Sequence, residues 1–253
     1  MLLENRNAVI YGGGGAIGGA VARAFAREGA RVHPAGRTQA PLDRVAEEIR
    51  AAGGAAETAL VDALDEAAVD RHADAVAERF GGIDISFDLI SLGEVQGTPL
   101  AEMSSELFER PIVTAVRSFF LTARAAARHM IPQGSGVILN FGGDGGHEPI
   151  RNYSIGGFQV AVQAMSSLRR QLAAELGEHG IRVVTLHTGG IPETIPPTEP
   201  GRGSITEMIS AKTLLGRAAT LDDVGDVAAF LASDRAASIT AASINITCGA
   251  VAD

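Results

Sequence analysis

A glycine loop near the start of the chain reads Tyr11-Gly12-Gly13-Gly14-Gly15-Ala16-Ile17-Gly18. It follows the short apolar run 8–10 and precedes a segment whose apolar residues recur at helical spacing. Glycines here allow a tight turn and let backbone N–H groups approach an anion, at which the following helix directs its positive end. The loop therefore indicates a dinucleotide site, although the glycines alone also fit a plain connection from strand to helix.

The residues around the loop favour the dinucleotide interpretation. Apolar residues between 20 and 25 keep helical spacing until Gly29, which predicts the end of a helix. The run 31–35 then predicts a second strand that ends at Gly36 and Arg37. A strand, a helix and a second strand in this order form the opening of a βαβ unit.

Composition limits the classes of protein to which the chain can belong. It has 253 residues, of which 46% are apolar and 20% charged, and we expect one α/β domain over 1–253. The net charge of −9, from 21 basic and 30 acidic side chains, argues against a nucleic-acid partner.

The single cysteine, Cys248, allows no internal disulfide. Residues 1–7 lack the apolar core of a signal peptide, and no apolar run is long enough to cross a membrane. We therefore expect a cytoplasmic protein with no membrane partner.

Helical patterns alternate with short β-like runs almost to the end of the chain. This alternation predicts a doubly wound, Rossmann-type fold with a seven-stranded parallel sheet and helices on both faces. The predicted strands are 8–11, 31–35, 55–60, 83–90, 136–141, 182–186 and 243–247, and the predicted helices are 17–28, 41–52, 66–79, 112–130, 157–177 and 221–232.

One stretch, 188–203, is predicted to be irregular because it carries four prolines, Pro192, Pro196, Pro197 and Pro200. A long loop in a compact domain is often a binding element. We therefore expect a substrate lid at about 190–212, with an inert surface loop as the alternative.

Several separate stretches resemble the short-chain dehydrogenase/reductase family along nearly the whole chain. The loop 11–18 is similar to the family's TGxxxGxG, with Tyr11 for threonine and Ala16 for the middle glycine. Residues 180–189, GIRVVTLHTG, are similar to its GIRVNxxxPG, and LGR at 215–217 and FLASD at 230–234 match later motifs. The usual NNAG after the fourth strand reads Asp88-Leu89-Ile90-Ser91 here.

The resemblance implies a nicotinamide cofactor. It assigns cofactor contacts to Gly12, Gly14, Gly15, Ala16, Ile17, Arg37, Asp62, Ile90 and Ile191. At the end of the second strand, members that bind NAD carry an acidic residue for the ribose hydroxyl, whereas a basic residue accommodates a 2′-phosphate. This chain has Gly36 at the acidic position, followed by Arg37, whose guanidinium can pair with phosphate. NADP(H) is therefore favoured over NAD(H), with a solvated loop arginine as the alternative.

The four catalytic positions implied by the family hold unusual residues. The asparagine position falls on Ala115, the serine position on Gly143, and the YxxxK pair on Phe158 and Val162. Phenylalanine has no exchangeable proton and valine no charge. The only lysine of the chain, Lys212, falls in the predicted lid. The usual tyrosine–lysine proton transfer is therefore excluded.

Two other side chains are candidates for replacing the missing acid. His147 can exchange a proton near neutral pH, and Tyr153 can donate a hydrogen bond to a carbonyl. A surface histidine and a tyrosine that closes the loop are the alternatives. His187 fits a packed histidine, and no spacing motif supports a metal site.

Three functions remain open at this point. The first is an NADP(H)-dependent oxidoreductase with an atypical active site, which transfers hydride to a small carbonyl-type substrate. The second is a cofactor-binding protein without turnover, such as a sensor or a partner subunit, and the third is a lyase or isomerase on the same scaffold. The resemblance also implies a homotetramer or homodimer formed through the helices 112–130 and 157–177.

Overall fold

Short apolar runs form the strands of one parallel sheet in the computed structural model, which describes residues 1–142 and 153–252. The strands are β1 (Asn7–Tyr11), β2 (Arg31–Gly36), β3 (Ala55–Ala56), β4 (Ala59–Leu60), β5 (Ile85–Asp88), β6 (Gly136–Gly142), β7 (Ile181–His187) and β8 (Ser243–Asn245). Their order is β3-β2-β1-β5-β6-β7-β8, and β4 also pairs with β2. The predicted seven-stranded parallel sheet is confirmed, since β3 and β4 share one position beside β2.

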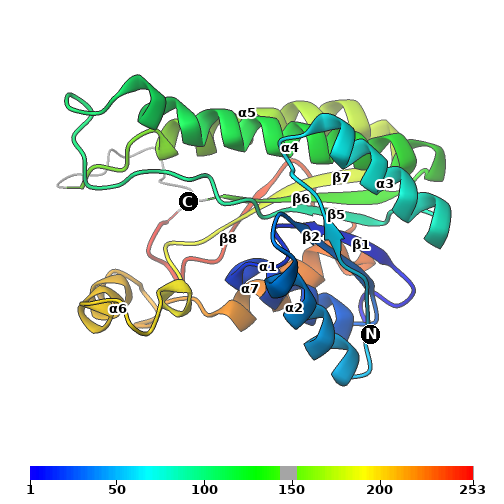
Figure 1. Cartoon of the computed structure of the whole chain (residues 1–253), viewed down its shortest axis with the longest axis horizontal. Helices are drawn as coiled ribbons and strands as arrows, with labels where there is room; N and C mark the ends of the chain where they lie inside the picture. The colour runs from blue at the N-terminus through cyan, green and yellow to red at the C-terminus, as the bar shows by residue number, and fades with distance from the viewer. Residues whose placement is uncertain (143–152, 253) are drawn as a thin grey trace.

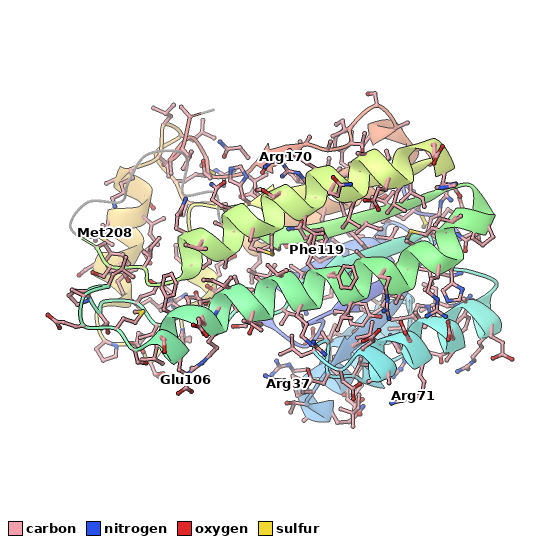
Figure 2. All side chains as sticks on the ribbon, turned by 90° about the horizontal axis from the view of Figure 1, so that it is seen from above. Arg37, Arg71, Glu106, Phe119, Arg170 and Met208 are labelled. Carbon is pink, nitrogen blue, oxygen red and sulfur yellow. The ribbon has the colours of Figure 1, made fainter. Side chains whose placement is uncertain are left out.

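Amphipathic helices cover both faces of this sheet (Figure 1). One face carries α3 (Glu66–Phe80), α4 (Ser105–Gln133) and α5 (Phe158–Leu176), and the other carries α1 (Ala16–Arg27), α2 (Gln39–Ala51) and α7 (Leu221–Ala232). Each face has its own apolar core, in which Phe119 and Phe25 respectively are fully buried. Figure 2 labels Phe119 on α4.

Two helices begin where proline obscures the sequence pattern. Helix α4 begins at Ser105 rather than near 112, because Pro111 lies inside the helix and Ser104 caps it by accepting from the Leu107 N–H. The stretch predicted to be irregular contains a short 3₁₀ helix, Pro192–Thr194, and ends in α6 (Arg202–Ala211). This helix starts directly after the last proline of the stretch, Pro200, so part of the predicted lid is helical.

The connections on the two sides of the sheet diverge between β1 and β5. The chain leaves β1 for α1 on one face, and it leaves β5 for α4 on the other. In open parallel sheets this divergence opens a crevice outside the carboxyl ends of the strands, where ligands bind. Figure 1 shows α6 beyond the same edge of the sheet, opposite the segment that leads into α4.

Candidate functional site

The glycine loop turns at the carboxyl end of β1 in a conformation that few other residues can adopt. Gly12 has φ +82°, and a Cβ there would lie 2.3 Å from the carbonyl oxygen of Leu89. The N–H groups of Gly12 and Gly13 both donate to the carbonyl of Ala35 at the end of β2, at 2.8 and 3.1 Å. The loop is thus tied to β2, and the approach of Leu89 leaves no room for a side chain at Gly12.

Helix α1 begins immediately after this turn with its first amides open. Its N-cap, Gly15, supplies no side-chain hydrogen bond, and its first turn contains no acidic residue. The N–H groups of the first turn of any α-helix lack partners within the helix, and they lie at the positive end of its dipole. The predicted contacts Gly14, Gly15, Ala16 and Ile17 therefore surround a place suited to a phosphate.

The last glycine of the loop brings the helix close to the turn. A Cβ on Gly18 would lie 2.2 Å from the carbonyl oxygen of Gly12, so a side chain there would push α1 away from the loop. Residue 16, where the family pattern has glycine, accommodates an alanine at the first position of the helix. The cradle therefore fits a pyrophosphate despite this departure.

The end of β2 carries an unpaired cation. Arg37 is exposed, and it makes no hydrogen bond or ion pair within the described part of the chain. Figure 2 labels it on the side of the molecule where α2 and α3 lie. The side chain of Thr38, the N-cap of α2, makes no capping hydrogen bond, and the first turn of that helix also lacks an acidic residue. The end of β2 is therefore a second place that suits an anion.

Two more predicted cofactor residues lie at strand ends. Asp62 is exposed just beyond β4 and accepts a hydrogen bond from the N–H of Leu64 at 3.0 Å. Ile90 follows β5, and its N–H donates to Asp88 at 3.1 Å. A third, Ile191, is buried in the chain segment that leaves β7. All three lie at the carboxyl edge, which groups them with the glycine loop.

A buried polar cluster lies directly beneath this edge. Asp88 accepts from the Ser118 hydroxyl of α4 at 2.8 Å, and burial raises the pKa of its carboxyl to about 6 against the opposing effect of its two hydrogen bonds. Tyr11 Oη lies 3.5 Å from His72 Nδ1, and burial raises the pKa of that phenol. Burial lowers the pKa of His72 to about 4, so this imidazole is neutral at physiological pH. His72 of α3 and Ser118 of α4 complete the cluster from one face of the sheet, and neither belongs to a sequence motif.

The residues predicted to occupy the family's catalytic positions form an apolar wall in the described part of the chain. Ala115 of α4 is fully buried, Val162 of α5 is 4% exposed, and Phe158 begins α5 half-buried against the same core. Gly157, just before it, lies so close to α4 that a Cβ would meet the Phe108 carbonyl oxygen at 2.0 Å. The starts of α4 and α5 are therefore fixed side by side, with carbon rather than polar atoms at three of the four positions.

Of the two candidate acids, the structure describes Tyr153 but not His147. Tyr153 is 55% exposed, and its hydroxyl donates to Gln96 Oε1 at 2.7 Å. His147 and Gly143 lie outside the described residues. His187 is buried at the end of β7, with Nδ1 2.8 Å from Ser243 Oγ. Within 1–142 and 153–252, no group of three His, Cys, Asp or Glu side chains is placed to hold a metal ion.

Sequence reasoning missed Glu94 and Gln96, which lie on the segment after β5. Gln96 Nε2 donates to Glu94 Oε1 at 3.4 Å and thereby extends the contact of Tyr153. Neither residue belongs to a motif. The one signal in the sequence was their place after a strand of the sheet, where ligand-binding loops gather.

Residues 14–250 match the family described as enoyl-(acyl carrier protein) reductase. A relative from Bacillus subtilis, the oxidoreductase YxbG, is 31% identical and covers 99% of this chain and 92% of its own length. L-xylulose reductase of Bos taurus is 28% identical, with 99% of this chain and 98% of that protein covered. The crystal structure of a short-chain dehydrogenase from Burkholderia cenocepacia in complex with NADP superposes with a TM-score of 0.85 at 25% identity and covers 100% of both chains.

None of the helices within the described ranges is long and apolar enough to cross a membrane.

Proposed function

The chain belongs to the short-chain dehydrogenase/reductase family of oxidoreductases, and on this basis we propose that it transfers hydride between NADP(H) and a small carbonyl-type substrate. Members of this family bind nicotinamide cofactors. The observation that carries the proposal is the start of α1, whose first amides have no capping side chain. The glycine loop before it is so close-packed that Gly12 and Gly18 leave no space for a Cβ. That cradle suits the pyrophosphate of a dinucleotide.

Each predicted contact has a distinct task in this proposal. The glycine turn from Gly12 to Gly15 leaves room for the pyrophosphate, the amides of Ala16 and Ile17 hold it, and Asp62 contacts the adenine. Ile90 and Ile191 contact the nicotinamide half from the carboxyl ends of β5 and β7. The nicotinamide supplies the hydride when it is bound. The apolar wall of Ala115, Phe158 and Val162 excludes water from the reacting carbon.

Proton supply is where this site departs from its family. With Phe158 and Val162 at the YxxxK positions, hydride transfer relies on proximity and on a different proton source. His147 is the proposed donor, and Tyr153 contacts the substrate through its hydroxyl. Loss of a general acid costs about 10²- to 10⁴-fold in rate, so turnover should be slow but measurable.

Arg37 is proposed to select NADP(H) by pairing with the 2′-phosphate. Its exposure and its lack of a partner among the described residues support this role, since the guanidinium needs no rearrangement to receive the phosphate. Arg37→Ala should weaken NADPH binding about 10- to 100-fold and leave NADH binding nearly unchanged. The matched control is Arg71→Ala, which removes an exposed arginine of α3 that Figure 2 also labels. Fluorescence titration measures both cofactors. Equal losses for NADPH and NADH would refute the assignment of the phosphate.

Turnover is tested with purified protein and NADPH on carbonyl, imine and activated-alkene substrates. Oxidation of NADPH with any of them supports the proposal, whereas binding without oxidation across the panel would contradict hydride transfer. The double variant His147→Ala, Tyr153→Phe then tests the two candidate residues. Unchanged turnover in that variant would eliminate both.

Self-association through α4 and α5 completes the proposal. Val113 and Phe120 of α4 and Val160 of α5 expose 57%, 44% and 47% of their surface, which is unusual for large apolar side chains on outer helices. A homotetramer or homodimer would cover them. Sedimentation of the wild type and of Phe120→Glu checks this, since the variant should dissociate while keeping its helical content.

A further inference from the structure

Three polar side chains form a hydrogen-bonded row on the segments that follow β5 and precede α5. Tyr153 Oη donates to Gln96 Oε1 at 2.7 Å, and Gln96 Nε2 donates to Glu94 Oε1 at 3.4 Å. Glu94 and Gln96 lie on the segment after β5, and Tyr153 lies just before α5. The row thus joins the two segments that border the apolar wall of Phe158 and Val162.

The carboxylate of Glu94, at the end of the row, fixes which group donates in each of the two hydrogen bonds. An ionised carboxylate only accepts hydrogen bonds, so Gln96 must present its amide NH₂ to Glu94. Its carbonyl oxygen then faces Tyr153, and the phenol must donate its only hydrogen to it. The groups left for a ligand are the lone pairs of Tyr153 Oη, the second oxygen of Glu94 and one N–H of Gln96 Nε2, so the row offers mainly acceptors and a negative charge.

The backbone holds the row in place. The N–H of Gly97 donates to the carbonyl of Ser154 at 2.7 Å, which ties the segment after β5 to the segment before α5. Gly156 has φ +57°, and a Cβ there would lie 2.8 Å from the Val95 carbonyl oxygen. Because the two segments are in direct contact, the acceptors are arranged before any ligand arrives.

No described cation forms an ion pair with Glu94. The carboxylate itself is half-buried. Arg110, whose Cδ lies 3.5 Å from the place that a Cβ on Gly93 would take, pairs instead with Glu106 at 3.7 Å. Val162 stands where the family has a lysine, so the cation that would repel a positive ligand is missing from that position.

We propose that the substrate of this site carries a protonated nitrogen, which donates to Tyr153 Oη and pairs with Glu94. The inference rests on the proposed function, because it concerns the substrate reduced beside the bound cofactor. A neutral carbonyl oxygen would meet only lone pairs at Tyr153 Oη and at Glu94, and a carboxylate or phosphate would be repelled by Glu94. A charge-assisted N–H···O contact is the strongest interaction that these acceptors can make.

Binding of two ring isosteres to the NADP⁺ complex tests the proposal. Piperidine is protonated at neutral pH, and tetrahydropyran has the same ring with a neutral oxygen. Calorimetry should show at least about tenfold tighter binding of piperidine. Glu94→Gln should remove most of this preference, and Tyr153→Phe should reduce it, whereas Glu102→Gln, which changes an exposed glutamate of the same connecting segment, should preserve it. Equal binding of the two rings to the wild type, or a preference that survives in Glu94→Gln, would overturn the proposal.

Turnover separates this inference from the function on which it rests. Piperidin-4-one and tetrahydropyran-4-one present the same carbonyl with and without the charged nitrogen. We expect kcat/KM with NADPH to be about tenfold higher for piperidin-4-one in the wild type and nearly equal for both ketones in Glu94→Gln. Reduction of both ketones at equal rates by the wild type refutes the inference and leaves the oxidoreductase intact. Failure to bind NADPH refutes the proposed function itself, and NADPH binding by Glu94→Gln shows that this variant is folded.

Discussion

Replacement of Asp88 by asparagine should stabilise the protein at neutral pH and remove a pH dependence. Asp88 is fully buried at the end of β5, where it accepts hydrogen bonds from the Ser118 hydroxyl and the Ile90 N–H. Burial raises the pKa of its carboxyl from 3.8 to about 6. Asparagine can accept from Ile90 and donate to the hydroxyl oxygen of Ser118, so it keeps both contacts without a charge.

The sign and size of the effect follow from proton linkage. Between pH 4 and pH 6 the native state holds the Asp88 proton more tightly than the unfolded chain does, so the free energy of unfolding falls as pH rises through this window. The shift of about two pKa units corresponds to about 3 kcal/mol, of which about 2.5 kcal/mol is lost between pH 4 and pH 8. Asp88→Asn removes this loss, so its advantage over the wild type should grow by about that amount.

Urea unfolding of both proteins at pH 4, 6 and 8, followed by circular dichroism, measures the difference. Subtracting the two profiles cancels the contribution of His72, because both proteins keep this residue. Glu47→Gln is the matched control, since it neutralises an exposed carboxylate of α2 and should leave the profile unchanged. A stability difference between the wild type and Asp88→Asn that is the same at pH 4 and pH 8 would refute the assignment of a buried, destabilising carboxylate.

Three further outcomes test the packing around the site. Gly18→Ala should lower the melting temperature and abolish cofactor binding, because its Cβ would lie 2.2 Å from the Gly12 oxygen. The control is Gly203→Ala on α6, whose Cβ would meet nothing within 4 Å. This variant should melt at or above the wild-type temperature. Ser118→Ala should cost about 1–3 kcal/mol in urea unfolding at pH 8, since it leaves the Asp88 carboxylate without one donor. The His72 ring should remain neutral at pH 5 in an NMR titration, because burial lowers its pKa to about 4, and the stability that it contributes above pH 6.5 should be lost as pH falls toward 4.

Patterns local in sequence were sufficient to predict the sheet and most helices. The βαβ opening, the parallel sheet and α7 (Leu221–Ala232) follow from short apolar runs and helical periodicity, which are local in the sequence. Prediction failed where a proline is accommodated by its surroundings. Pro111 lies buried inside α4, and the stretch after Ile191 becomes helical as soon as its prolines end.

Sequence by itself determined that the chain has a glycine loop before α1, an arginine after β2 and a single lysine, Lys212, because each of these depends only on the identity of residues along the chain. Only the tertiary structure decided which polar groups face one another. Asp88 meets Ser118 across 30 residues, and Tyr153 meets Gln96 across 57, because parallel strands bring their carboxyl ends to one edge whatever their distance along the chain. Burial and the direction of those hydrogen bonds, neither of which has a local sequence signal, then set the charge and acceptor character of the site.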